Sequence, residues 1–270
     1  QEKSQGADIS IIEGVMGLYD GFSSTDETSS TAQIAKLLDA PVVLVIDSHG
    51  MSRSVAAMVK GYQQFDRELK FSGVILNKVG SARHFDLLKE AIEHYTNVPV
   101  LGAIFKDPKA QIPERHLGLM TAGENKDLAV CLESLAELAG NRSGDQRYGL
   151  DLEQIMRIAK KSPSLTEVSN VNSSVVQTCN VKIGIALDKA FSFYYQANLD
   201  LLKAYGAELV PFSPLSDRMI PEGVGSLYFG GGFPEVYAEE LEANAALRSQ
   251  IKEAVERGLP VYAECGGLMY

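Results

Sequence analysis

The sequence has few cysteines, no long apolar run and a deficit of basic charge. Its three cysteines, Cys131, Cys179 and Cys265, stand far apart, so they form neither a disulfide framework nor a CxxC zinc pattern. No apolar stretch reaches the length needed to cross a membrane. The 25 basic residues are outnumbered by 35 acidic ones, which argues against a general nucleic-acid or membrane-surface binder. We therefore expect a cytoplasmic protein with no nucleic-acid partner and no membrane partner.

Two features of a complete catalytic site are also missing from the sequence. The chain has no GxxxxGK[ST] phosphate loop, and its histidines all precede residue 117. A thiol nucleophile normally needs a base partner, so either Cys265 is inert or its base lies in another segment. The first residue is Gln1 rather than an initiator Met, and we expect the natural chain to begin further upstream.

The first half of the sequence alternates strand-like and helix-like segments. We expect strands at 9–14, 41–47, 71–77 and 99–104, and helices at 32–38, 54–65, 84–95, 126–139 and 152–161. The segment 41–47 is almost continuously apolar, which is typical of a parallel strand covered on both faces. This order predicts a doubly wound, mainly parallel α/β sheet that binds ligands at the carboxyl ends of its strands.

The second half repeats the same alternation after a change of composition. Residues 162–180 are rich in Ser, Asn, Thr and Val, which predicts an interdomain linker. After it we expect strands at 181–186, 208–210, 226–229 and 259–264, and helices at 195–205 and 234–257. The sequence therefore predicts two doubly wound α/β domains, residues 1–161 and residues 181–270, and 270 residues suffice for two modest cores.

The last residues of the chain have the pattern of a nucleophile elbow. Cys265 follows an apolar strand and precedes Gly266 and Gly267. Such a turn exposes the thiol at a helix N-terminus, where the helix dipole favours the thiolate. The backbone N–H groups of Gly231 and Gly232 would suit an oxyanion hole, although a tight turn before a helix is the simpler interpretation. The presence of Cys265 one strand further on favours the oxyanion hole.

Three segments of the first half carry weaker signals. Glu13 opens a glycine-rich stretch, residues 13–21, that suits Mg²⁺ and phosphate or is only a turn between strand and helix. Asn77 ends an expected strand, where its amide would pair with a purine edge or serve an ordinary turn. Arg115, within residues 113–119, would grip a carboxylate or phosphate, although a solvated charge cluster is slightly favoured.

Four segments together resemble the cobyrinic acid a,c-diamide synthase family. They are residues 13–21 (EGVMGLYDG), 113–119 (PERHLGL), 229–235 (FGGGFPE) and 263–270 (AECGGLMY), and the likeness runs in order over essentially the whole chain. The resemblance implies a first domain similar to dethiobiotin synthetase, of the P-loop class, and a second domain similar to class I glutamine amidotransferases. The family uses ATP and Mg²⁺ to activate the a and c carboxylates of cobyrinic acid, and ammonia from L-glutamine completes each amide.

The resemblance also implies roles for single residues. Cys265 matches the glutaminase nucleophile, which forms a γ-glutamyl thioester and releases ammonia. The other implied roles are oxyanion donors at Gly231 and Gly232, a Mg²⁺ ligand at Glu13, an acid near the activated carboxylate at Asp20, and an adenine contact at Asn77.

The chain departs from the family pattern at both ends. The family's phosphate loop would lie upstream of residue 1 and its triad histidine downstream of residue 270, so we expect this chain alone neither to hydrolyse ATP nor to release ammonia. Two alternatives remain open. One is amidation of another acidic tetrapyrrole, hydrogenobyrinic acid or nickel-sirohydrochlorin. The other is a non-catalytic regulator with the same ATPase fold, against which the elbow at Cys265 argues.

Overall fold

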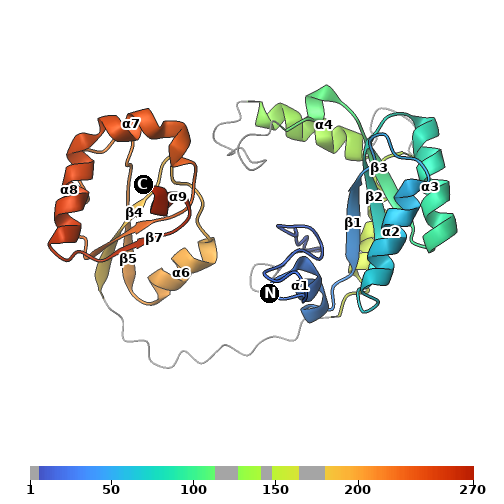
Figure 1. Ribbon diagram of the computed structural model, residues 1–270, viewed down its shortest axis with the longest axis horizontal. Helices are drawn as coiled ribbons and strands as arrows, with labels where there is room; N and C mark the ends of the chain where they lie inside the picture. Colours follow the sequence, from blue (N-terminus) through green and yellow to red (C-terminus); the bar gives the residue numbers. More distant parts are fainter. Residues whose placement is uncertain (1–5, 113–126, 141–147, 164–179) are drawn as a thin grey trace. The chain divides into compact units, whose positions relative to one another are not determined.

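The chain folds into two compact units, each with its own sheet (Figure 1). The computed structural model describes residues 6–112, 127–140, 148–163 and 180–270. The first three ranges belong to unit 1 and the last range to unit 2. Every strand pair in both sheets is parallel, which confirms the expected α/β fold class. The segment 113–119 lies outside the described residues.

Unit 1 contains a three-stranded parallel sheet in the order β1-β2-β3. Its elements are α1 (Thr31–Leu37), β1 (Val42–Asp47), α2 (Ser54–Phe65), β2 (Phe71–Val79), α3 (Ala82–Thr96), β3 (Val100–Phe105), the 3₁₀ turn η2 (Pro108–Ala110), α4 (Leu128–Gly140) and α5 (Leu152–Ala159). Asp47 pairs with Asn77, so the carboxyl ends of β1 and β2 lie side by side.

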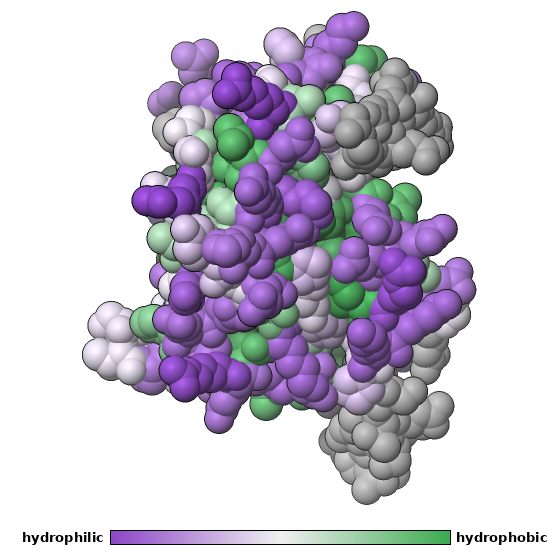
Figure 2. All heavy atoms as spheres, turned by 90° about the vertical axis from the view of Figure 1, so that its right-hand side faces the viewer, coloured by the Kyte–Doolittle hydropathy of each residue, from purple (hydrophilic) through white to green (hydrophobic). Residues whose placement is uncertain are grey.

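The core of unit 1 lies between the sheet and the helices α2 and α3. Val55 and Val59 of α2, Leu88 and Ile92 of α3, and Leu76 of β2 are fully buried in one cluster. The spacing of four residues within each helix puts both side chains on the same face. The outer surface is mainly hydrophilic in the view of unit 1 given by Figure 2. These helices are therefore amphipathic, as the sequence pattern predicts.

The expected strand at residues 9–14 is wrong. These residues have no regular secondary structure, and the side chains of Ile11 and Ile12 are 85% and 60% exposed. A strand exists only where a neighbouring strand accepts and donates its backbone hydrogen bonds. Within the described part of the chain, no backbone hydrogen bond joins residues 9–14 to another segment. The apolar pattern of residues 9–14 alone was therefore not sufficient to predict a strand.

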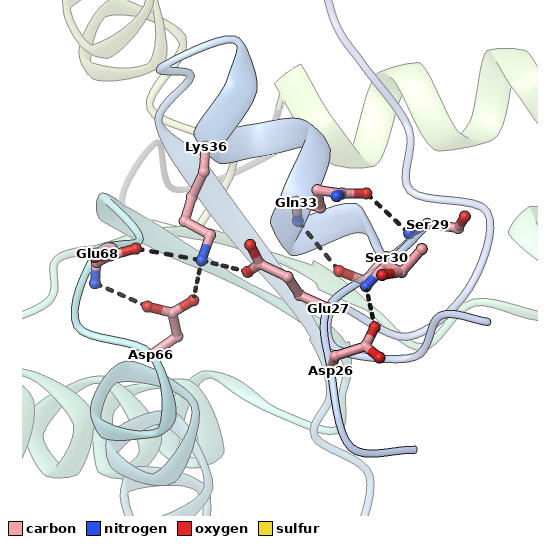
Figure 3. A network of polar contacts seen from close by, with 9 residues as sticks. Asp26, Glu27, Ser29, Ser30, Gln33, Lys36, Asp66 and Glu68 are labelled. Atoms are coloured by element: carbon pink, nitrogen blue, oxygen red, sulfur yellow. Dashed lines mark hydrogen bonds and ion pairs between the residues drawn. The ribbon is translucent and has the colours of Figure 1, made fainter. Parts of the chain in front are cut away.

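A polar network joins α1 to the turn before β2 (Figure 3). Ser30 caps α1, because its hydroxyl oxygen accepts a backbone N–H of the first turn at 3.1 Å. Lys36 forms ion pairs with Asp66 at 2.9 Å, with Glu68 at 3.4 Å and with Glu27. The Glu27 carboxylate, followed by Asp66, raises the pKa of Lys36, and the Lys36 ammonium lowers the pKa of Asp66. One cation thus holds three carboxylates together.

Unit 2 contains a four-stranded parallel sheet in the order β5-β4-β6-β7. Its elements are β4 (Val181–Ala186), α6 (Gln196–Ala204), β5 (Ala207–Phe212), β6 (Ser226–Phe229), the 3₁₀ turn η4 (Pro234–Tyr237), α7 (Ala238–Ala243), α8 (Ala245–Glu256), β7 (Val261–Ala263) and α9 (Gly266–Met269). The chain passes from β4 to β5 on one side and then to β6 on the other. This reversal is a topological switch point, and α/β proteins bind ligands at the carboxyl ends of the strands that flank it.

The single helix expected at residues 234–257 is also wrong. The segment forms η4, α7 and α8, and the last two are separated by Asn244. The side-chain amide of Asn244 donates to the carbonyl oxygens of Pro214 at 2.8 Å and Asp217 at 2.7 Å. These two bonds fix the junction between α7 and α8 to the segment that follows β5. The break lets Leu241 and Leu247 both enter the core of unit 2.

Candidate active site

Cys265 lies at a strained turn between β7 and α9. Its backbone has φ +50° and ψ −120°, and its side chain is exposed. A positive φ at a residue other than glycine costs of the order of 1–3 kcal/mol, and such strain is found where a structure fixes a functional side chain. The strand–turn–helix geometry expected at Cys265 is therefore present, with the thiol at the carboxyl edge of the sheet.

The glycine loop, residues 230–232, follows β6 and packs directly against the segment 190–194, which follows β4. A Cβ added to Gly230 would lie 2.6 Å from Cζ of Tyr194, and one added to Gly232 would lie 2.8 Å from the carbonyl carbon of Ala190. Neither distance is possible for a real Cβ atom. Glycine therefore lets the Tyr194 ring pack on the loop at Gly230 and lets the backbone at Ala190 approach Gly232.

Gly231 lies between this packed segment and the thiol. A Cβ on Gly231 would be 3.6 Å from Sγ of Cys265. The N–H of Gly231 donates to the carbonyl oxygen of Phe193 at 3.1 Å, so it is already occupied in this structure. By contrast, the N–H groups of Gly232 and Gly266 have no hydrogen-bond acceptor within the described residues. The N–H groups of Gly232 and of Gly266, the residue directly after Cys265, thus remain without a protein acceptor in the described ranges, and the oxyanion role of Gly232 stays a prediction.

A group of tyrosines surrounds the carboxylate next to the thiol. The hydroxyl of Tyr228 donates to Glu264 at 2.6 Å, and that of Tyr262 donates to the same carboxylate at 3.3 Å. The ring of Tyr194 packs edge-on against Tyr228, with ring centroids 5.1 Å apart. Burial, followed by the bond to Glu264, raises the pKa of Tyr228 above its ordinary value. Burial also raises the pKa of Tyr194 to about 12. Both phenols are therefore neutral donors at physiological pH.

Sequence reasoning missed Tyr194. The expected helix at 195–205 placed it only as a residue before a helix, while α6 begins at Gln196. A usable signal was present, because residues 191–195 contain four aromatic residues shortly after the strand expected at 181–186. Aromatic residues at the carboxyl edge of a parallel sheet occupy the place where ligands bind.

Asn77 of unit 1 lies at the carboxyl end of β2, as the sequence predicts. Its side-chain oxygen accepts the backbone N–H of Lys78 at 2.9 Å, which leaves its amide N–H groups without an acceptor in the described part of the chain. Lys78 has φ +56° and forms an ion pair with Asp47 at 2.8 Å. The hydrogen bond from Lys78 is the main cause of the lowered pKa of Asp47. Asn77 thus has donors available at the edge where ligands bind α/β sheets.

The glycine-rich stretch 13–21 lies elsewhere in unit 1. Leu18 and Tyr19 pack with the first residues of β1 and β2, and the hydroxyl of Tyr19 donates to the carbonyl oxygen of Tyr62 at 2.5 Å. Asp20 is therefore near the amino end of the sheet, whereas Asn77 is at the carboxyl end, and the structure does not bring them together. The side chains of Glu13 and Asp20 are exposed.

The described residues contain no preformed metal-binding site made of protein side chains alone. No group of three or more His, Cys, Asp or Glu side chains within them is placed to hold a metal ion. Mg²⁺ typically takes only one or two carboxylates together with water and substrate phosphates. Glu13 and Asp20 fit that donor chemistry as exposed carboxylates, but they do not form a protein site alone.

The sequence matches two domain families, one in each unit. Residues 182–270 match a CobB/CobQ-like glutamine amidotransferase domain, and residues 1–113 match an AAA domain. The chain is 50% identical over 98% of its length to the cobyrinate a,c-diamide synthase of Caldanaerobacter subterraneus subsp. tengcongensis. It is 49% identical over its full length to that of Methanosarcina barkeri and 47% identical over its full length to that of Listeria innocua. The chain is thus similar over its whole length to proteins named cobyrinate a,c-diamide synthase.

The likeness to these proteins covers the chain but only part of each relative. The chain corresponds to 56%, 55% and 58% of the three relatives, so it spans about half the length of the curated relatives it matches. No solved structure matches the chain significantly. The amidotransferase match includes Cys265 and the glycine loop, and the AAA match includes Glu13, Asp20 and Asn77. None of the helices in the described ranges is both long and apolar enough to span a membrane.

Proposed function

We propose that the protein is an ATP-dependent ligase that amidates the a and c side-chain carboxylates of cobyrinic acid with ammonia from L-glutamine. The observation that carries the proposal is the similarity, over the whole chain, to proteins named cobyrinate a,c-diamide synthase. The elbow at Cys265, inside the matched amidotransferase domain, supports the use of glutamine. Unit 1 would then activate the carboxylate, and unit 2 would supply the ammonia.

In the proposed glutaminase reaction, Cys265 is the nucleophile. Its thiolate attacks the side-chain amide carbon of glutamine, and the oxyanion that forms accepts the N–H groups of Gly232 and Gly266. Collapse of this intermediate breaks the C–N bond, and protonated nitrogen leaves as ammonia. Water then hydrolyses the γ-glutamyl thioester to glutamate and regenerates the thiol. Residues 180–270 contain no histidine, so the base that takes the thiol proton is not a histidine of this segment.

In the proposed synthetase reaction, the residues of unit 1 bind and orient the nucleotide. The free amide N–H groups of Asn77 would donate to the adenine edge. Glu13 would contribute a carboxylate oxygen to Mg²⁺, and Asp20 would lie near the substrate carboxylate. When bound with ATP, Mg²⁺ neutralises charge on the phosphates. These three roles are carried by the family resemblance alone.

The charge of the protein fits this function. A formal net charge of −10 disfavours binding to nucleic acid or to an anionic membrane surface. We propose a cytoplasmic enzyme whose partners are the acidic tetrapyrrole, ATP and L-glutamine. We further propose residues 1–161 as the synthetase domain, 162–180 as the linker and 181–270 as the amidotransferase domain.

A product-mass experiment tests the proposed function. The natural protein at its full length is incubated with Mg-ATP, glutamine and cobyrinic acid, and the products are read by mass spectrometry. Two successive carboxylate-to-amide conversions are expected. No conversion of cobyrinic acid, together with conversion of hydrogenobyrinic acid or nickel-sirohydrochlorin, would keep the reaction and replace the substrate. Failure with every tetrapyrrole would overturn the proposal.

A further inference from the structure

The hydroxyl of Tyr194 links two strand ends of unit 2. It donates to the carbonyl oxygen of Ala186, the last residue of β4, and accepts the N–H of Gly230 at 3.0 Å. Gly230 directly follows β6. A single side-chain oxygen therefore joins the ends of the two strands that flank the switch point.

Gly230 carries this link on to the elbow. Its carbonyl oxygen accepts the N–H of Gly267 at 2.9 Å, an N–H that it shares with the carbonyl oxygen of Glu264, also at 2.9 Å. Gly267 lies in α9, two residues after Cys265. Tyr194, Gly230 and Gly267 thus form a continuous chain of hydrogen bonds from β4 to the helix that begins at the nucleophile. Movement of Gly230 would move both the glycine loop and the elbow.

The ring of Tyr194 fixes where its hydroxyl lies. The ring fills the space where Gly230 would carry a Cβ, and its other side packs edge-on against Tyr228. Tyr228 is itself held by Glu264, the residue before Cys265. Because the phenol must donate to one partner and accept from the other, only its neutral form satisfies both Ala186 and Gly230. Its raised pKa of about 12 keeps it neutral.

We propose that Tyr194 is a positioning residue of the glutaminase site, whose hydroxyl holds the glycine loop and the elbow at their working separation. The proposal rests on the glutaminase function proposed above. Tyr194 acts through Gly230 and does not contact the thiol. The structure of the segment explains why a hydroxyl is needed there: without it, the Ala186 carbonyl and the Gly230 N–H lose their shared partner.

Tyr194→Phe tests the proposal with little change of shape, since it removes one oxygen and keeps the ring. Tyr195→Phe is the matched control, because Tyr195 is 76% exposed and its hydroxyl has no partner within the described residues. Both variants are made in the natural protein at its full length. Glutamine hydrolysis, amidation with free ammonia, and amide hydrogen exchange at Gly230 and Gly267 are measured.

For Tyr194→Phe we expect kcat for glutamine hydrolysis to fall about ten- to hundredfold, since small displacements of reacting groups cost that much. We expect KM for glutamine and the ammonia-dependent rate to change little. Exchange at Gly230 and Gly267 should become about tenfold faster, because local opening becomes easier. Tyr195→Phe should match the unaltered protein in every measurement.

The outcomes separate the two proposals. An unaltered kcat in Tyr194→Phe would overturn the positioning role, and so would a loss of ammonia-dependent activity equal to the loss with glutamine, which would indicate general misfolding. If the unaltered protein itself does not hydrolyse glutamine, the proposed function fails. In that case, hydrogen exchange alone tests the positioning role of Tyr194. Unchanged protection at Gly267 in Tyr194→Phe would contradict the link from Tyr194 to the elbow.

Discussion

A Cβ on Gly231 would lie 3.6 Å from the Sγ of Cys265 and 3.1 Å from the Cβ of Phe193. The thiol of Cys265 and the segment after β4 therefore face each other across a single glycine. Since the elbow, the glycine loop and this segment each follow a different strand, the site depends on the strand order of the whole sheet. Each of these three segments is short and continuous in the sequence, but their relative positions depend on strands that are distant in the sequence.

Cys265→Ala should separate the two nitrogen sources. We expect glutamine-dependent amidation to fall by about a thousandfold or more, because the covalent step is lost. Amidation with free ammonia should remain close to that of the unaltered protein, and both rates are read from product masses. The control is Cys131→Ala, which changes a buried thiol of α4 in unit 1 and should keep the use of glutamine. Equal loss with both nitrogen sources would contradict a dedicated glutaminase nucleophile.

Two glycine substitutions should have opposite effects on stability. Gly232→Ala puts a Cβ against the carbonyl of Ala190 at a residue with φ +157°, and we expect it to destabilise unit 2 by about 2–3 kcal/mol. Gly61→Ala lies within α2, with open space around the new Cβ, and we expect it to stabilise unit 1 by about 0.5–1 kcal/mol. Urea unfolding of each variant gives both values. A neutral Gly232→Ala would show that the loop is not packed as described.

Asn244→Ala should weaken unit 2 through two lost hydrogen bonds. The carbonyl oxygens of Pro214 and Asp217 would lose their donor at a side chain that is only 9% exposed. Leaving such groups unsatisfied costs about 1–3 kcal/mol, which is the expected loss in the free energy of unfolding. Gln250→Ala is the comparison for urea unfolding, because it removes a single bond to the backbone N–H of Ile220. A loss smaller than that of Gln250→Ala would contradict the role assigned to Asn244.

The ion pairs of Lys36 predict a pH dependence of the stability of unit 1. The pKa of Asp66 is lower in the folded state than its unfolded value of about 4, so Asp66 stabilises the folded state above that unfolded pKa. This stabilisation should be lost as the pH falls through the lowered folded pKa. Asp66→Asn should therefore lower the thermal midpoint at neutral pH and flatten its decline in acid. A parallel decline in both proteins would show that Asp66 does not contribute.

The parts of the fold that depend on local pattern were predictable from the sequence. The apolar strand at 41–47 appears as β1, and the turn at Cys265 has its expected geometry, because a strand followed by Cys-Gly-Gly specifies that turn by itself. The predictions that were wrong depended on contacts between segments that are distant in the sequence. At the helix break, the side chain of Asn244 bonds to Pro214 and Asp217, about thirty residues away in the chain, and such partners are found only in three dimensions.

The residues of the candidate site also differ in how far the sequence alone predicts them. Cys265 and the glycine loop carry their own signals, whereas Tyr194 matters only because Gly230 lies beside it in the folded sheet. For Gly231, the sequence predicted an oxyanion donor, and in this structure its N–H donates to the carbonyl oxygen of Phe193. The roles of Glu13, Asp20 and Asn77 stay predictions.

The strand order of unit 2 also sets an order of events during synthesis. β4 is an inner strand, but one of its neighbours, β6, ends only at Phe229, long after β5 has been made. A ribosome that has completed β4 and β5 has therefore produced a two-stranded ribbon with one side of β4 still unpaired. Unpaired strand edges can pair with other chains, so the nascent protein carries an aggregation-prone edge until β6 emerges.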